Sequence, residues 1–127
     1  MKFRALLVDD EPSVLVTLLA ILQLKGLDVH TATSGRAARD LLHSNTFDLV
    51  ITDISMETKT AGYEVVLAAK LHPDKPTTLV ISGYPELLAD WQKEGADAML
   101  NKPTDTSEFL STVDVLLNQR QSHKKNI

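Results

Sequence analysis

The sequence Leu49-Val50-Ile51-Thr52-Asp53 is an apolar run, rich in β-branched residues, that ends in a carboxylate. Such a run is typical of a strand buried on both faces, as in a parallel sheet covered by helices. Because a buried charge is costly, we expect Asp53 to lie where this strand emerges at its carboxyl end. In open α/β sheets, ligands bind at that edge.

Three other apolar runs end beside polar side chains in the same way. They are residues 5–8 before Asp9 and Asp10, residues 79–81 before Ser82, and residues 98–100 shortly before Lys102. If the strands are parallel neighbours, their carboxyl ends meet at one edge of the sheet. We then expect three carboxylates, a hydroxyl and an ammonium group to converge on one crevice.

Segments with helical spacing separate these runs. We expect helices over residues 11–25, 34–43, 62–71, 85–94 and 105–118, and strands over 3–8, 29–32, 49–53, 77–81 and 98–100. Strands joined by crossover helices are parallel. The sequence therefore predicts an α/β fold, a three-layer sandwich around a five-stranded parallel sheet. Residues 119–127 are polar and basic, and we expect a frayed tail there.

The composition fits one ordinary globular domain. The 127 residues are 43% hydrophobic and 24% charged, and no apolar run approaches the roughly 18 residues of a membrane span. A net charge of −4 gives no general reason to expect direct binding of nucleic acid or of an anionic membrane. The chain has no cysteine. Because its amino terminus runs directly into the expected first strand, we expect no signal peptide. We expect a cytoplasmic protein.

The expected crevice is suited to phosphate chemistry. Asp9, Asp10 and Asp53 would repel one another in a confined site, and a hard divalent cation such as Mg²⁺ relieves that repulsion. Lys102 and Ser82 across from the acidic residues suit a tetrahedral anion. A carboxylate in such a set can attack phosphorus and form an aspartyl phosphate. Asp53, on the central run, is the best placed nucleophile.

These residues and their neighbours resemble the receiver domains of two-component response regulators, over residues 3–118. The matching motifs are Leu-Leu-Val-Asp9-Asp10-Glu11-Pro, Leu-Val-Ile-Thr-Asp53-Ile-Ser-Met56, Val-Ile-Ser82-Gly83, Gly95-Ala96-Asp97 and Lys102-Pro103. The resemblance implies a flavodoxin-like, doubly wound (βα)5 topology. It also implies a receiver domain over residues 1–119, followed by a tail or the start of a linker over 120–127.

The resemblance further implies a role for each matched residue. Asp53 is expected to be the phosphoacceptor. Asp10, the Asp53 side chain and the backbone carbonyl of Ser55 are expected to bind Mg²⁺ directly, and Asp9 to act through metal-bound water. Lys102 is expected to contact a phosphoryl oxygen.

Two further residues matter for switching and for the geometry of the crevice. Ser82 corresponds to a switch hydroxyl that moves to the phosphoryl group. Pro103 follows Lys102 through a peptide bond that is cis in the family, and a cis bond before proline costs little.

Three departures from the family pattern are visible. The loop after the phosphoacceptor carries Glu57 where proline is usual, and Gly62 comes one residue late. Met99 stands where a switch aromatic is usual, so the usual aromatic rotation does not apply. Thr104 replaces the phenylalanine that usually follows Lys102-Pro103. These departures concern the output of the domain more than its phosphorylation.

The expected function is that of a phosphoacceptor receiver, rather than of an enzyme with turnover. A sensor histidine kinase or a phosphotransfer protein would donate the phosphoryl group to Asp53, in a Mg²⁺-dependent reaction that the receiver itself catalyses and slowly reverses by hydrolysis. Phosphorylation would change a face made by the fourth helix, the fifth strand and the fifth helix. That face would bind a downstream protein or a second copy of the chain.

Two rival functions remain at this point. The chain could be a receiver-like module that docks partners constitutively, without phosphorylation, and the altered loop and Met99 leave that alternative open. It could instead be a small phosphatase with Asp53 as nucleophile. A phosphatase of the haloacid-dehalogenase type needs a second aspartate two residues later as general acid, and Ser55 occupies that position.

Overall fold

Five strands form one parallel sheet in this computed structural model, which describes residues 2–125. They are β1 (Arg4–Val8), β2 (Asp28–Ala32), β3 (Leu49–Asp53), β4 (Thr77–Ser82) and β5 (Ala98–Asn101). Their order across the sheet is β2-β1-β3-β4-β5, which places β3 at the centre, between β1 and β4. The predicted five-stranded, doubly wound parallel sheet is confirmed.

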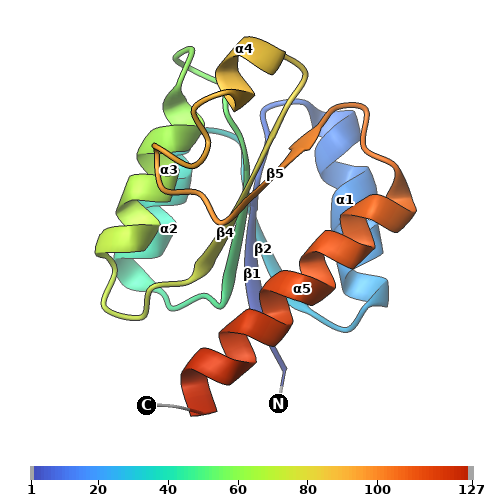
Figure 1. Cartoon of the computed structure of the whole chain (residues 1–127), viewed down its shortest axis with the longest axis vertical. Helices are drawn as coiled ribbons and strands as arrows, with labels where there is room; N and C mark the ends of the chain where they lie inside the picture. The colour runs from blue at the N-terminus through green and yellow to red at the C-terminus, as the bar shows by residue number, and fades with distance from the viewer. Residues whose placement is uncertain (1, 126–127) are drawn as a thin grey trace.

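Helices cover both faces of the sheet. They are α1 (Pro12–Leu24), α2 (Gly35–Ser44), α3 (Ala61–Leu71), α4 (Pro85–Leu88) and α5 (Thr106–Lys125). Figure 1 shows α1 and α5 on one face of the sheet and α2 and α3 on the other. The predicted three layers are therefore present. Over the described residues, no helix combines the length and the apolar character needed to cross a membrane.

The alternation of side chains along the strands divides the core between these faces. Leu49 and Ile51 of β3 pack with buried residues of α1 and α5, whereas Val50 packs with buried residues of α2 and α3. All five residues of β3 are buried, as a run apolar on both faces predicts. Each fully buried aliphatic side chain contributes about 1.5–3 kcal/mol, so the central strand is firmly held.

Local signals set the ends of the first two helices. Gly26, just after α1, has φ +94, a left-handed conformation that glycine adopts without steric cost. The Ser34 hydroxyl accepts a hydrogen bond from the Ala37 N–H at 3.1 Å and so caps α2. The chain therefore turns sharply at both places.

The fourth helix is shorter than predicted. We expected a helix over residues 85–94, but α4 ends at Leu88 and is followed by turns up to Gly95. Leu88 and Trp91 pack toward the core, whereas Gln92, Lys93 and Glu94 are exposed. A short helix depends on burial of an apolar face. Beyond Leu88, this segment buries little apolar surface apart from Trp91, so further helical turns gain little stabilisation from packing.

The last helix is longer than predicted. The expected frayed tail from residue 119 is wrong as far as Lys125, because α5 continues to that residue, and residues 126 and 127 lie outside the described part of the chain. Arg120 is 1% exposed and continues the buried stripe of Phe109, Val113 and Leu116. An arginine in this stripe makes the segment look polar in the sequence. The domain limit at residue 119 stays a prediction.

Candidate functional site

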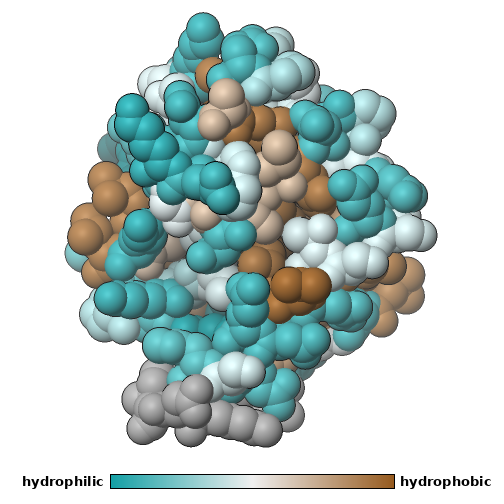
Figure 2. Space-filling model, viewed as in Figure 1, coloured by the Kyte–Doolittle hydropathy of each residue, from teal (hydrophilic) through white to brown (hydrophobic). Residues whose placement is uncertain are grey.

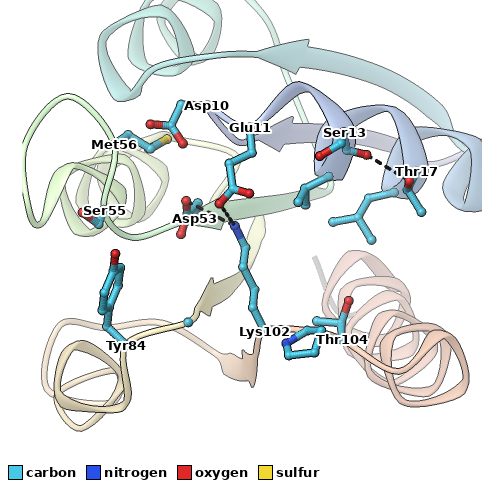
Figure 3. A pocket seen from close by; sticks show the side chains of 14 residues that line it. Asp10, Glu11, Ser13, Thr17, Asp53, Ser55, Met56, Tyr84, Lys102 and Thr104 are labelled. Atoms are coloured by element: carbon cyan, nitrogen blue, oxygen red, sulfur yellow. Dashed lines mark hydrogen bonds and ion pairs between the residues drawn. The ribbon is translucent and has the colours of Figure 1, made fainter.

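A cleft opens at the carboxyl edge of the sheet, where the sequence predicted it. Asp53 ends β3, Asp9 follows β1, and Lys102 follows β5. Figure 3 shows the Lys102 side chain reaching across the cleft toward Asp53 and Glu11. The cleft is also lined by residues from α1 and from the loops after β1, β3, β4 and β5, namely Asp10, Ser13, Val14, Thr17, Leu18, Ser55, Met56, Gly83, Tyr84, Pro103 and Thr104.

Lys102 holds the centre of the site. Its Nζ lies 2.9 Å from Asp9 Oδ2, 3.4 Å from Asp53 Oδ2 and 3.4 Å from Glu11 Oε1. Burial lowers the pKa of Lys102, but the hydrogen bond to Asp9 and the surrounding negative charges outweigh burial and raise that pKa above its ordinary value. Lys102 is therefore a cation at neutral pH.

Asp53 lies in a costly position for a carboxylate. Burial raises its pKa to about 6, although the nearby Lys102 acts in the opposite direction and the charge of Asp9 adds to the rise. One oxygen of this carboxyl group accepts a hydrogen bond from the Ile54 N–H at 2.9 Å. The other faces Lys102. Asp53 is therefore fixed in orientation and poorly solvated, and it gains from any added positive charge.

The acidic residues form a compact group of oxygen donors. Asp9, Asp10, Glu11 and Asp53 each offer a carboxylate oxygen, and these oxygens all lie within 4.8 Å of one another. Asp9 and Asp53 are buried, whereas Asp10 and Glu11 are exposed. A set made only of oxygens, with room for water on its exposed side, fits a hard cation such as Mg²⁺. The residues present therefore fit the metal that the sequence predicted.

Glu11 is a member of this group that the sequence reasoning did not single out. Its carboxylate contacts Lys102, and its backbone N–H donates to Asp9 Oδ1 at 2.9 Å. The position of Glu11 directly after Asp9 and Asp10 is the sequence feature that could have identified it as part of this group.

A glycine lets the first turn of α3 approach the end of β3. The Gly62 N–H donates to the Ile54 carbonyl at 2.8 Å. A Cβ atom on Gly62 would lie 2.1 Å from the Asp53 carbonyl oxygen, so no larger residue fits without displacing the backbone. This close approach fixes the loop that carries Ser55, which lines the cleft beside Asp53.

Ser82 lies at the expected strand end but is engaged elsewhere. It is fully buried, and its hydroxyl accepts a hydrogen bond from the Tyr84 N–H at 3.0 Å. The Ser82 carbonyl accepts from the Lys102 N–H at 3.0 Å, which joins the ends of β4 and β5. Gly83 and Tyr84, which follow Ser82, line the cleft. The switch role of Ser82 stays a prediction.

The remaining predicted residues occupy two environments. Pro103 lines the cleft, and the Lys102–Pro103 peptide bond is cis. Met99 is half-buried and packs against the cluster around Leu88 and Val80, away from the lining of the cleft. The structure thus brings Asp9, Asp53 and Lys102 into direct contact and places Met99 outside that contact.

A parallel five-stranded sheet with acidic residues and a lysine at its carboxyl edge defines the class of doubly wound α/β proteins with a charged cleft at that edge. Comparison with known families is more specific. Residues 5–114 match the model of the response regulator receiver domain, so this chain belongs to that family. The prediction made from the motifs is confirmed.

Individual relatives agree with this family. The chain is 30% identical, over 118 residues, to the response regulator protein PilR of Pseudomonas aeruginosa, and 27% identical, over 117 residues, to the heme response regulator HssR of Staphylococcus aureus. These alignments cover 92% and 90% of this chain but only 26% of PilR and 51% of HssR. The chain therefore spans a quarter to a half of the length of these two regulators.

A solved structure gives the same result for the fold. The CheY-like receiver domain protein of Methanospirillum hungatei aligns with a TM-score of 0.87 and 25% identity, covering 97% of this chain and 99% of that one. The chain is thus a receiver domain of two-component signalling, with a CheY-like fold.

Proposed function

We propose that this receiver accepts a phosphoryl group on Asp53 from a sensor histidine kinase or a phosphotransfer protein. One observation supports this above all others: the Asp53 carboxylate is buried, fixed by Ile54 and placed 3.4 Å from the Lys102 ammonium. The nucleophile and the cation that would balance a phosphoryl oxygen therefore lie side by side, at the open edge of the sheet.

The proposed transfer is a displacement at phosphorus. An Asp53 carboxylate oxygen attacks the phosphorus atom of a phosphohistidine, the new P–O bond forms, and the P–N bond breaks with its electron pair passing to the imidazole, which takes up a proton. Lys102 stabilises negative charge on the transferred group. Hydrolysis of the resulting acyl phosphate would return Asp53 to its free form.

The acidic group would hold Mg²⁺. The proposed ligands are Asp10, the Asp53 side chain and the Ser55 carbonyl, with Asp9 acting through a water molecule. When bound, the ion supplies positive charge that offsets both the carboxylates and the incoming phosphoryl group. Asp9 also holds the Lys102 ammonium at 2.9 Å, so it orients the lysine in the cleft.

Rapid turnover as a phosphatase is not part of this proposal. Ser55 lies two residues after Asp53, where an aspartate would be needed as general acid. We infer a signalling domain that phosphorylates itself from a donor and loses the group slowly, inside the cytoplasm.

The proposed output surface is the face formed by α4, β5 and α5. Figure 2 shows this face, on which apolar side chains gather between α4 and α5 within a mostly hydrophilic surface. The half-buried Ala98 and Met99 of the edge strand β5 belong to this region, and Val115 of α5 is 55% exposed. Phosphorylation would draw the Ser82 hydroxyl away from the Tyr84 N–H and so move the start of α4. The partner would be a downstream protein or a second copy of the chain.

One observation favours a second candidate, a receiver that docks partners without phosphorylation. Met99, which stands where an aromatic switch is usual, packs into the cluster around Leu88 and Val80. A face held in this way could be competent for binding in the unmodified protein.

The decisive experiment is intact mass spectrometry after incubation with an acyl phosphate, with and without Mg²⁺, for the wild type and Asp53→Asn. We expect a gain of one phosphoryl group that requires Mg²⁺ and is absent in the variant. If the wild type gains no mass in any condition, phosphoryl transfer is refuted and constitutive docking is favoured.

A further inference from the structure

The loop between β3 and α3 is tied to a helix far away in the sequence. Glu57 in this loop is exposed, yet both of its carboxylate oxygens are engaged: Oε1 accepts from the Gly35 N–H and Oε2 from the Arg36 N–H, each at 2.8 Å. These donors are the first two backbone N–H groups of α2, which lack partners within the helix. Two charge-assisted bonds of this kind are stronger than ordinary hydrogen bonds.

The local geometry is built for this contact. A Cβ atom on Gly35 would lie 3.2 Å from the Ala61 Cβ and 3.4 Å from Glu57 Oε1, so glycine allows the start of α2 to lie against the start of α3. The third N–H of α2, that of Ala37, is bonded to the helix's own cap, Ser34. Glu57 and Ser34 therefore cap the same helix, but only Glu57 connects it to the loop after Asp53.

This contact bears directly on the cleft because the loop is short. Ile54 is anchored on one side, since its N–H donates to Asp53 Oδ1 and its carbonyl accepts from the Gly62 N–H. Glu57 is anchored on the other side by α2. Only Ser55 and Met56 lie between the two anchors, and both line the cleft.

We propose that Glu57 is a positioning residue, whose bonds to the start of α2 hold the loop after Asp53 so that the Ser55 carbonyl faces the Mg²⁺ site. This inference rests on the proposed function, because it concerns a ligand of the proposed metal. It also explains the departure from the family pattern at Glu57. Where the family usually has a rigid proline, Glu57 fixes the loop through its hydrogen bonds to Gly35 and Arg36.

The test is a titration of Mg²⁺ at constant ionic strength, followed by the backbone amide resonances of the phosphate-free protein. We expect Glu57→Ala to weaken Mg²⁺ binding about tenfold, which is the lower end of the effects seen when groups behind a metal ligand are removed. Glu57→Gln keeps one acceptor oxygen and is expected to weaken binding about threefold.

Two controls separate positioning from general effects. Ser34→Ala removes the other cap of α2 and is expected to lower the melting temperature without changing the Mg²⁺ dissociation constant. Glu64→Gln removes one negative charge from the exposed pair with Arg39, on the neighbouring surface, and is also expected to leave that constant unchanged. Dispersed amide spectra verify that each variant is folded.

Each result has a definite meaning. Weaker Mg²⁺ binding in both Glu57 variants, with both controls unchanged, supports the inference. Unchanged binding in Glu57→Ala, or equal weakening in Glu57→Ala and Ser34→Ala, overturns it while leaving the proposed function intact. If the wild type itself does not bind Mg²⁺, the metal-dependent function fails, and the inference fails with it.

Discussion

The two ends of the central strand each carry a buried cluster of charges, and the clusters differ in their completeness. At the amino end, Arg120 pairs with Asp48 at 3.1 Å and with Asp74 at 2.9 Å, and it donates to the Asp74 and Lys75 carbonyls. Its side chain is 2% exposed. The guanidinium group thus contacts oxygen atoms of Asp48, Asp74 and Lys75, and it is buried although the Asp74 side chain is 40% exposed. We call this cluster closed because its central cation is buried.

At the carboxyl end, the cluster is open and unbalanced. Over the described residues, one ammonium group, that of Lys102, contacts Asp9, Glu11 and Asp53, and Asp10 completes a group of four carboxylates. Burial of Asp53 raises its pKa to about 6. A buried charge by itself therefore does not indicate function. An excess of like charge beside an open cleft does indicate a missing partner.

The largest expected effect comes from breaking the closed cluster. Arg120→Met leaves Asp48 and Asp74 without their shared cation, and removal of one partner from a buried ion pair costs about 3–5 kcal/mol. We expect a loss of that size in the free energy of unfolding, measured in urea. The folded variant should bind Mg²⁺ with unchanged affinity, because the cleft lies at the other end of the sheet.

The matched control is Arg39→Met. Arg39 forms an exposed pair with Glu64 at 3.5 Å, and such pairs contribute about 0–1 kcal/mol. A loss below about 1 kcal/mol for Arg120→Met would show that the closed cluster is no more important than a surface pair.

The second largest expected effect comes from removing the buried charge of Asp53 from the open cluster. The pKa of Asp53 is raised from 3.8 to about 6, so the folded protein holds this proton more tightly than the unfolded chain. Stability from this group is present below pH 4 and is lost as the pH rises to about 6. We therefore expect Asp53→Asn to be more stable than the metal-free wild type by on the order of 2–3 kcal/mol at pH 8. At pH 4 the difference should be small.

Urea unfolding at several pH values, in the presence of a chelator, measures this difference. Asp40→Asn, on the exposed side of α2, should show no comparable change between pH 4 and pH 8. A constant difference between Asp53→Asn and the wild type across this range would contradict a strained Asp53 carboxylate.

The smallest expected effect comes from removing the positive charge of Lys102 from the cleft. Lys102→Met removes a positive charge from the acidic group, so a dication no longer has to approach an ammonium group. We expect Mg²⁺ to bind about tenfold more tightly, as the removal of one charge a few ångströms away implies. Phosphorylation of Asp53 should nevertheless fall.

Amide resonances followed during a Mg²⁺ titration give the affinity, and Lys93→Met on the exposed turn after α4 is the control. Weaker Mg²⁺ binding in Lys102→Met would mean that the lysine organises the acidic group rather than competing with the metal.

The sequence predicted the open cluster well because its signals are local. Asp9, Asp53 and Lys102 each follow an apolar run, and the topology of a parallel sheet then brings them together without further information. The positions of the five strands followed from the same runs. Family motifs added the expected roles of the site residues, and all of these roles stay predictions.

The parts that the sequence did not predict depend on contacts between distant residues. Arg120 occupies a buried position of α5 because Asp48 and Asp74 meet it there, and neither is near it in the chain. Glu57 reaches back to Gly35, and an isolated glutamate in a polar loop carries no periodic signal. The end of α4 at Leu88 depends on how little apolar surface follows it, which propensity alone does not reveal.

The distance between the two ends of β3 has a consequence for how this domain tolerates substitutions. Asp48 directly precedes this strand and Asp53 ends it, so the two residues lie about 16 Å apart at roughly 3.3 Å per residue. Substitutions that far apart usually have additive effects on stability. We therefore expect that substitutions around Asp48, at the amino end of β3, can change the stability of the domain without changing the reactivity of Asp53 at the carboxyl end.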